Sequence, residues 1–267
     1  MSGESTDEFE VYAMRYAHRE SGVRAEHFYG FDDCQDQLSP MDFYVWAAIS
    51  PSTTVIVDAG FTPQTAATRG GGREYLRTPM ETLSGLGRAA DTVEHLVITH
   101  LHYDHVGHIA DFPRAEVLVQ RAEYDFWSGP MADRGDYAHL SYKSDMDYLA
   151  GQLDAGRVRL LDGDTTVVPG ITTHFLGGHT PGMQAVRVKT NKGYVALASD
   201  SSHFYENFQT DRPFAIVDHL PSMYLAFDKL RELASTEELI IPGHDPRVME
   251  RFPAASPELE GFAVRIA

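Results

Sequence analysis

Cysteine is almost absent from this sequence, in which Cys34 is the only one among 267 residues. A lone cysteine can form no disulfide within the chain and cannot by itself make a thiolate metal site. Long apolar runs are absent too, since none approaches the roughly 18 residues that a transmembrane helix needs. These absences exclude a disulfide-stapled scaffold and a membrane-spanning helix, predict no membrane partner, and fit a reducing, cytoplasmic setting.

Positive charge is also scarce. The chain has 22 Lys and Arg against 39 Asp and Glu, which gives a formal net charge of −17. Such a surface repels phosphate backbones and argues against nucleic acid as a partner. A small anionic ligand stays compatible with this charge, because a bound metal can reverse the local field.

The beginning of the sequence, MSGESTDEFE, lacks the charged-then-apolar pattern of an export signal. Its acidic and polar composition predicts a disordered tail over residues 1–10. The remaining residues, 11–267, have an ordinary content of hydrophobic residues and no internal repeat or long linker. We therefore expect them to form a single domain.

Two catalytic signatures are missing as well. The sequence contains no G-x-S-x-G motif, the turn that presents a serine nucleophile, and Cys34 has no motif around it. The helical zinc motif H-E-x-x-H is also absent. We therefore expect neither a serine or cysteine nucleophile nor a metal site built on one helix.

Short apolar runs bounded by turn residues predict strands along most of the chain. Their ranges are 43–50, 53–60, 95–99, 115–120, 158–163, 171–176, 193–199 and 238–245. Helical spacing or helix-start signals predict helices from residue 78, from residue 121, within 143–155 and at 221–235. Strands and helices alternate in the second half, which indicates an α/β or α+β class.

Residues 62–81 contain two contrasting local signals. Residues 62–77, TPQTAATRGGGREYLR, are rich in glycine and in basic side chains, which predicts a mobile loop. The helix that follows has a clear start, with Thr78 at the N-cap, Pro79 at the first helical position and Glu81 completing a capping box.

Histidine and aspartate are concentrated in THLHYDHVGH, residues 99–108, and recur after three later apolar strands. Loops at strand ends are where rigid scaffolds commonly build sites. The residues concerned are His100, His102, Asp104, His105, His179, Asp200 and His244. They are too many for one tetrahedral zinc, which takes about four ligands, whereas two metals sharing a bridging carboxylate would use all of them.

The spacing inside the cluster supports a common target. His100, His102 and Asp104 lie two residues apart, so in an extended segment they project to the same side. His105 breaks this alternation and requires a turn, which Gly107 would help the chain to make. We expect His108 to belong to the loop rather than to the metal shell.

At this point the sequence resembles a known family. The pattern HLHYDH, followed in order by GGHTPG, ALASD and IPGHD, is similar to the motif set of the metallo-β-lactamase superfamily. The resemblance implies an α+β fold, an αβ/βα four-layer sandwich in which two central mixed β-sheets are flanked by helices. It also implies a first metal on His100, His102 and His179, a second on Asp104, His105 and His244, and Asp200 as the bridge between them.

Within the superfamily, the segments THLHYDHVGH and DSSHFYENF are similar to those of the N-acyl homoserine lactonase group. This implies a hydrolase that opens an N-acyl homoserine lactone or a related small lactone, by attack of metal-bound hydroxide on the carbonyl. Two divalent metals per chain are implied, for which the ligand types suit Zn and also Fe, Mn or Co. Asp58 in VDAGF is expected to brace the site through hydrogen bonds.

One position departs from the lactonase pattern. Those enzymes usually carry Tyr three residues after the bridging Asp, where this sequence has His203, with Tyr205 two residues further on. We expect Asp104, His203 and Tyr205 to be the catalytic candidates, with His203 orienting the substrate and Tyr205 as the second candidate for protonating the leaving oxygen.

Other functions remain open on sequence alone. A thioester hydrolase of the glyoxalase II type would share all seven ligands but would need a basic patch for its substrate carboxylates. Another ester or amide hydrolase of the superfamily would use the same metals. A non-enzymatic metal-binding protein would show missing ligands, and none is missing. The expected partner is a small lactone or ester, with a homodimer as a further expectation.

The residues that bind the substrate stay unknown at this stage. Aromatic side chains near the N-terminus either wall a pocket or pack in the core and in a dimer contact. They are Phe28, Tyr29, Phe31, Phe43, Tyr44 and Trp46.

Overall fold

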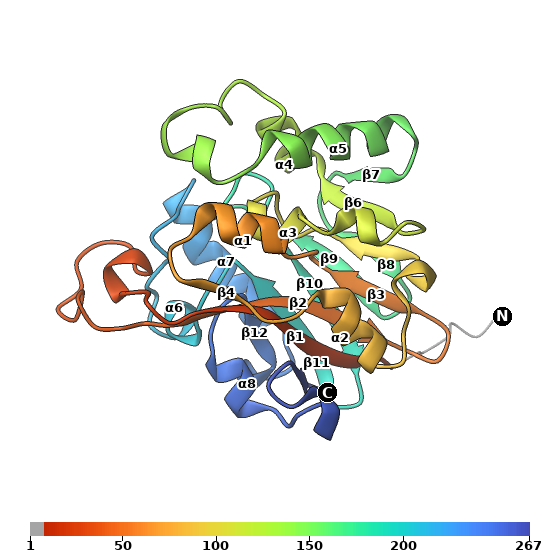
Figure 1. Cartoon of the computed structure of the whole chain (residues 1–267). Coiled ribbons are helices and arrows are strands. Elements are labelled where there is room, and N and C mark those ends of the chain that lie inside the picture. Colours follow the sequence, from red (N-terminus) through yellow and green to blue (C-terminus); the bar gives the residue numbers. More distant parts are fainter. Residues whose placement is uncertain (1–7) are drawn as a thin grey trace.

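Two β-sheets form the centre of the computed structural model, which describes residues 8–267 (Figure 1). The first sheet has the order β13-β1-β2-β3-β5-β6-β7, and β4 pairs with β1. Its strands are β1 (Glu10–Arg19), β2 (Met41–Ile49), β3 (Thr54–Val57), β4 (Arg73–Tyr75), β5 (His95–Val97), β6 (Glu116–Gln120), β7 (Val158–Leu161) and β13 (Ala263–Arg265). The run from β3 to β7 is parallel and the rest antiparallel, so the sheet is mixed.

The second sheet has the order β12-β11-β10-β9-β8. Its strands are β8 (Thr165–Val168), β9 (Ile171–Phe175), β10 (Gln184–Thr190), β11 (Gly193–Ser199) and β12 (Ile240–Pro242). This sheet is mixed as well, because β11 and β12 run parallel while the other pairs are antiparallel.

Helices cover the outer faces of both sheets. They are α1 (Pro63–Arg69), α2 (Pro79–Gly85), α3 (Tyr103–Val106), α4 (Arg121–Trp127), α5 (Lys143–Asp154), α6 (Tyr205–Gln209), α7 (Leu220–Leu233) and α8 (Arg247–Arg251). Leu83 of α2, Trp127 of α4 and Leu149 of α5 pack on the first sheet. Phe227 and Leu230 of α7 pack on the second.

Strand β2 contributes side chains to both hydrophobic cores. All nine of its residues are buried, and successive side chains point to opposite faces of a strand. Tyr44 and Trp46 join the core between the sheets, whereas Phe43 and Val45 join the core under the helices. A helix–sheet–sheet–helix sandwich follows, and the predicted α+β class and four-layer architecture are confirmed.

The predicted loop at 62–77 is wrong. Thr62 caps α1 by accepting a hydrogen bond from the backbone N–H of Thr65, and Pro63 occupies the first turn. The glycine run, in which Gly70, Gly71 and Gly72 all have positive φ, ends the helix and leads into β4. The glycines therefore mark a helix end and a turn, not a loop of 16 residues.

The helix predicted from residue 78 is confirmed in detail. Thr78 and Glu81 form the reciprocal capping box, with Pro79 at the start of α2. The predicted tail at 1–10 falls partly outside the described residues, which begin at residue 8. Within the described part Phe9 is buried and Glu10 begins β1, so ordered structure starts before residue 11. Among residues 8–267, no helix combines the length and the apolar character of a membrane span.

Candidate metal centre

Four strands deliver the predicted residues to one place between the two sheets. His100 follows β5 of the first sheet, and the cluster continues through the start of α3. His179, Asp200 and His244 follow β9, β11 and β12 of the second sheet. All of these side chains are buried. The structure groups them as His100, His102, His179 and Asp200 on one side and Asp104, His105 and His244 on the other.

Asp200 lies between the two groups and turns one oxygen to each. Its Oδ2 lies 3.6 Å from Nε2 of His100 and 3.4 Å from Nε2 of His179. Its Oδ1 lies 3.0 Å from Nε2 of His244 and 3.4 Å from Nε2 of His105. A carboxylate in this position can bridge two cations.

Several inward-facing atoms of this cluster lack hydrogen-bond partners. Among the described residues, Nε2 of His100, His105 and His244 and Oδ1 of Asp200 are buried without one. Buried polar atoms are nearly always satisfied, so a convergent set of orphaned lone pairs calls for an ion. Nitrogen and carboxylate donors of this kind suit Zn²⁺ and related divalent metals. The residues present therefore fit the metals that the sequence implied.

The outward-facing nitrogens of the imidazoles are held by the protein. Nδ1 of His179 lies 2.9 Å from the carbonyl oxygen of Ile216, and Nδ1 of His244 lies 2.9 Å from that of Asp42. A carbonyl only accepts, so each Nδ1 carries the proton and leaves the Nε2 lone pair free. Contacts of this type fix the ring orientation and the tautomer of metal-binding histidines.

Asp58 holds together three segments beneath the cluster. Its Oδ1 accepts the backbone N–H of Thr99, and its Oδ2 accepts the hydroxyls of Thr99 and Ser199. The same Oδ2 lies 2.8 Å from Nδ1 of His105. The backbone of Asp58 has a φ of 64°, a value that residues other than glycine rarely adopt. The strained backbone turns its carboxylate under the site.

The expectation that His100, His102 and Asp104 project from one extended segment is wrong beyond His102. His102 is extended, with φ −69° and ψ 153°, but α3 begins at Tyr103, so Asp104 reaches the site from a helical turn. Gly107 does not supply a special turn either, because its φ is −64°. A Cβ there would lie 2.9 Å from the carbonyl oxygen of Gly60, so close backbone approach requires the glycine.

Burial and mutual charge shift the pKa values of the cluster in both directions. Burial holds the pKa of His100 and His102 well below the ordinary value. Burial also opposes the charged form of His105, but the carboxylates of Asp200, Asp58 and Asp104 raise its pKa well above the ordinary value. Imidazoles that stay neutral are competent metal ligands.

His203 lies at the wall of the cluster. Its Nε2 is 2.9 Å from Oδ2 of Asp200, and its ring stacks on Phe214 with a centroid distance of 3.4 Å and an interplanar angle of 2°. Nδ1 of His203 is buried and has no hydrogen-bond partner in the described chain. The geometry also groups His203 with Asp200 and His244 as residues able to share a metal.

Tyr205 lies elsewhere. Its ring is fully buried in the hydrophobic core with Phe208, beneath the guanidinium of Arg251 at 3.7 Å from the ring centroid. The cavities that contact the metal cluster are not lined by it. This position does not favour Tyr205 as a proton donor.

Glu123 is a buried residue of the site that the sequence did not reveal. Its Oε1 accepts the backbone N–H of Leu101 and Nε1–H of Trp127, at 2.9 and 2.7 Å. Its Oε2 accepts the hydroxyl of Thr180 and the backbone N–H of Gly182, at 2.7 and 2.8 Å. Burial raises the pKa of Glu123, and these four donors oppose the shift. One carboxylate thus ties the segment of His100 and His102 to the segment of His179.

Asp42 is a second buried residue that sequence reasoning missed. Its carboxylate contacts Nδ1 of His18 at 2.6 Å and accepts from Tyr44 Oη at 3.0 Å, while its backbone carbonyl faces His244. Neither Asp42 nor Glu123 belongs to a recognisable motif, because their partners come from distant segments. The only sequence signal is a charged residue placed among buried positions of a strand or helix.

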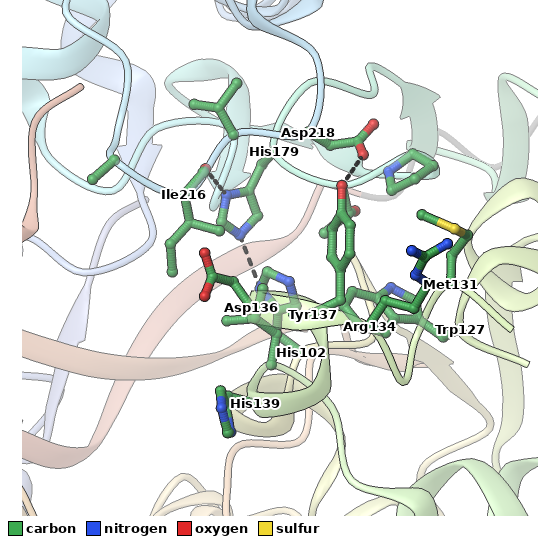
Figure 2. Close-up of a pocket in the computed structure, with 16 residues that line it drawn as sticks. His102, Trp127, Met131, Arg134, Asp136, Tyr137, His139, His179, Ile216 and Asp218 are labelled. Carbon is green, nitrogen blue, oxygen red and sulfur yellow. Dashed lines mark hydrogen bonds between the residues drawn. The ribbon is translucent and has the colours of Figure 1, made fainter. Parts of the chain in front are cut away.

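Two cavities meet at the cluster. The larger, of about 810 Å³, is lined by Trp127, Met131, Tyr137, Leu140 and Ile216 together with charged residues such as Arg134 and Asp136. Figure 2 shows His102 and His179 at its wall, and a hydrogen bond of 2.8 Å from Tyr137 to Asp218. The smaller, of about 220 Å³, is lined by five of the candidate ligands and extends toward Arg69 and Arg73; the five are His102, Asp104, His179, Asp200 and His244. His102, His179, Leu140 and Ile216 border both cavities.

The N-terminal aromatic residues lie in different parts of the structure. Phe43 lines the smaller cavity and packs edge-on against His244, whereas Tyr44 and Trp46 lie in the core between the sheets. Phe28 packs in a small cluster that includes Phe204 and Phe214. Tyr29 and Phe31 are exposed.

Comparison with known proteins agrees with the fold. The family model described as "Metallo-beta-lactamase superfamily" matches residues 43–244, which is most of the chain and includes every member of the cluster. The chain belongs to the metallo-beta-lactamase superfamily. The predicted membership is thereby confirmed.

Relatives within the superfamily include lactonases. The chain is 31% identical over 172 residues to an N-acyl homoserine lactonase from Bacillus thuringiensis, a match that covers 61% of this chain and 60% of that relative. The predicted similarity to this group is confirmed. The chain thus matches less than two thirds of the length of that relative.

Solved structures of lactonases share the fold. An N-acyl homoserine lactone hydrolase, with N-hexanoyl-L-homoserine bound at its catalytic metal center, gives a TM-score of 0.72 at 22% identity, covering 93% of this chain and 97% of that one. The dizinc quorum-quenching lactonase AidC gives 0.66 at 17% identity, covering 91% and 92%. At these identities the likeness concerns the fold.

Proposed function

We propose that the protein is a dinuclear metal-dependent hydrolase that opens a lactone ring, in an N-acyl homoserine lactone or a related small lactone. The observation that carries the proposal is the position of Asp200, which turns one oxygen toward each of two ligand groups. The similarity to N-acyl homoserine lactonases supports the lactone as the substrate class.

The chain's own residues would divide the work of holding the metals. His100, His102 and His179 would hold one, Asp104, His105 and His244 the other, and Asp200 would bridge them. Bound there, two divalent metals supply activated water near neutral pH and a Lewis acid that polarises a carbonyl. Zinc is the metal we propose, because the dizinc lactonase AidC shares the fold and the ligand types suit it.

The cavities give the substrate two places beside the cluster. We propose that an acyl chain lies in the larger cavity, where Trp127, Leu140 and Ile216 would remove it from water. The lactone carbonyl would then reach the junction of the two cavities, next to His102 and His179.

His203 would act on the substrate side of Asp200. The stacking on Phe214 and the contact with Asp200 leave the ring little freedom, so Nδ1 is held in a fixed direction. Burial keeps the pKa of His203 well below the ordinary value, which favours a neutral imidazole that orients the substrate by hydrogen bonding. A cytoplasmic location and a homodimer stay predictions.

Hydrolysis in ¹⁸O-labelled water tests the proposal directly. We expect one labelled oxygen to enter the product carboxylate within a single turnover, because the sequence contains no motif for a serine or cysteine nucleophile. Mass spectrometry of the product from metal-replete protein and N-hexanoyl homoserine lactone measures this. Label that appears only from the second turnover onward would mean that a protein oxygen attacks first, and no opening of this ring by metal-replete protein would refute N-acyl homoserine lactones as substrates.

Replacement of His203 tests its role. His203→Ala is expected to lower kcat/KM for the lactone by roughly ten to a thousandfold, because an orienting hydrogen bond or an acid is lost. Metal content is expected to stay the same as in the wild type. His219→Ala, at an exposed position on the N-terminal side of α7, is the matched control. Loss of metal in His203→Ala would instead make His203 a ligand, and unchanged kcat/KM would leave it without a role in catalysis.

A further inference from the structure

Arginine side chains line the smaller cavity opposite the metal cluster. Arg19, Arg69 and Arg73 all border it, in a chain whose net charge is −17. Arg19 is neutralised by Glu26, with Nη2 and Oε2 at 2.6 Å. The net positive charge of this wall therefore comes from Arg69 and Arg73.

The polar partners of these two arginines in residues 8–267 are uncharged. Nη1 of Arg69 donates to the carbonyl oxygen of His139 at 2.7 Å and to Oη of Tyr142 at 3.4 Å. Arg73 donates from Nε to Oη of Tyr103 at 3.1 Å and from Nη1 to the carbonyl oxygen of Gly70. A guanidinium carries five N–H donors, so both retain donors that the described chain does not use.

Both guanidinium groups are fixed against one buried residue. Arg69 lies 3.6 Å over the ring centroid of Tyr103, and Arg73 bonds the hydroxyl of the same side chain. Cation–π stacking and a hydrogen bond restrict their motion. Tyr103 directly precedes Asp104, so both charges stand at a set position relative to the metal cluster.

Asp104 is the acidic residue whose negative charge interacts electrostatically with Arg73. In the proposed function Asp104 holds a metal, and the metal takes up that negative charge. The wall at Arg69 and Arg73 is then left with two cations facing a small cavity of about 220 Å³. Burial in such a cavity strengthens the attraction of these charges for an anion.

We infer that Arg69 and Arg73 form an anion subsite for a carboxylate carried by the substrate. This inference rests on the proposed lactonase function and moves its substrate class from N-acyl homoserine lactones, which carry no free carboxylate, to related small lactones that bear one. Guanidinium groups pair with carboxylates through parallel N–H···O bonds, which the unused donors of Arg69 and Arg73 provide. The larger cavity, whose wall includes Trp127, Leu140 and Ile216, takes the remainder of the substrate.

Two matched compounds test the subsite: γ-butyrolactone carrying a carboxylate on its ring, and the uncharged amide of the same lactone. The wild type is expected to favour the carboxylate by about tenfold or more in kcat/KM, because charge-assisted hydrogen bonds are lost with the amide. In Arg69→Gln/Arg73→Gln the ratio of the two kcat/KM values should fall to about one, because the preference for the carboxylate is lost. Arg114→Gln, at an exposed arginine that borders neither cavity, is the matched control.

Binding of the ring-opened products gives a readout without turnover. Calorimetric titration of metal-replete protein should show the same preference for the dicarboxylate product over the amide product, and its loss in the double variant. A wild type without preference in binding, or a double variant that keeps it, overturns the subsite. Preferential binding without hydrolysis of either lactone refutes the lactonase proposal and leaves the subsite supported.

Salt provides a test that needs no variant. Raising the ionic strength is expected to reduce the wild-type preference for the carboxylate in binding, because screening weakens the pairing with Arg69 and Arg73. A preference that salt does not change would contradict the inference even if the double variant did not fold.

Discussion

Elemental analysis of metal-replete protein is expected to give about two divalent ions per chain, and about one after Asp104→Ala or His244→Ala. Both residues lie in the group that faces Oδ1 of Asp200, so their loss removes one metal and leaves the other group intact. The kcat/KM for the lactone should fall by about a thousandfold, since a metal supplies several kcal/mol to the transition state.

The control for these variants is Asp91→Ala, at an exposed aspartate that is not a member of the cluster. It should bind the same amount of metal as the wild type. A wild type that saturates at one ion per chain, with no change in Asp104→Ala and His244→Ala, would contradict the dinuclear proposal.

Glu123→Ala is expected to lower the free energy of unfolding of the metal-free protein by about 3 to 5 kcal/mol. The substitution leaves four buried donors without an acceptor, among them the backbone N–H groups of Leu101 and Gly182. Urea unfolding in the presence of a chelator measures this loss separately from any loss of metal. Metal affinity, measured by competition with a chelator, should also fall by about 10 to 100-fold, as for other residues that orient metal ligands.

Asp125→Ala offers a matched control, because Asp125 lies on the same helix but is exposed. Its effect on the free energy of unfolding should stay within about 0.5 kcal/mol. Glu123→Gln should lower the free energy of unfolding by an intermediate amount. The amide keeps one acceptor oxygen, but its NH2 group faces other hydrogen-bond donors. Unchanged unfolding in Glu123→Ala would show that Glu123 does not hold the two segments together.

Much of the site could be predicted because its residues follow short apolar strands. His179, Asp200 and His244 are recognisable in sequence as polar residues at the ends of such runs, and strand ends gather at one edge of a sheet. The capping box of α2 was equally predictable, since Thr78 and Glu81 interact within one turn. Local rules suffice where the interacting groups are close in sequence.

The rest of the site depends on contacts between distant segments. Glu123 contacts Leu101 and Gly182, and no spacing rule relates these positions. The sequence predicts a mobile loop around Arg69, because the three glycines after it are a stronger local signal than the helix cap that Thr62 forms. The alternation of His100 and His102 likewise does not reveal the helical turn that begins at Tyr103, nor the close approach of Gly107 to Gly60 after it.

The division of the candidate ligands between the two sheets bears on how the protein is made in the cell. His100 follows a strand of the first sheet and is synthesised long before His244, which follows a strand of the second. The complete centre can therefore form only once both sheets have been synthesised and packed together. A metal that binds only this packed state stabilises it by mass action, increasingly as free metal exceeds the dissociation constant. Metal supply would then govern how long newly made chains survive proteolysis, as well as how many of them are active.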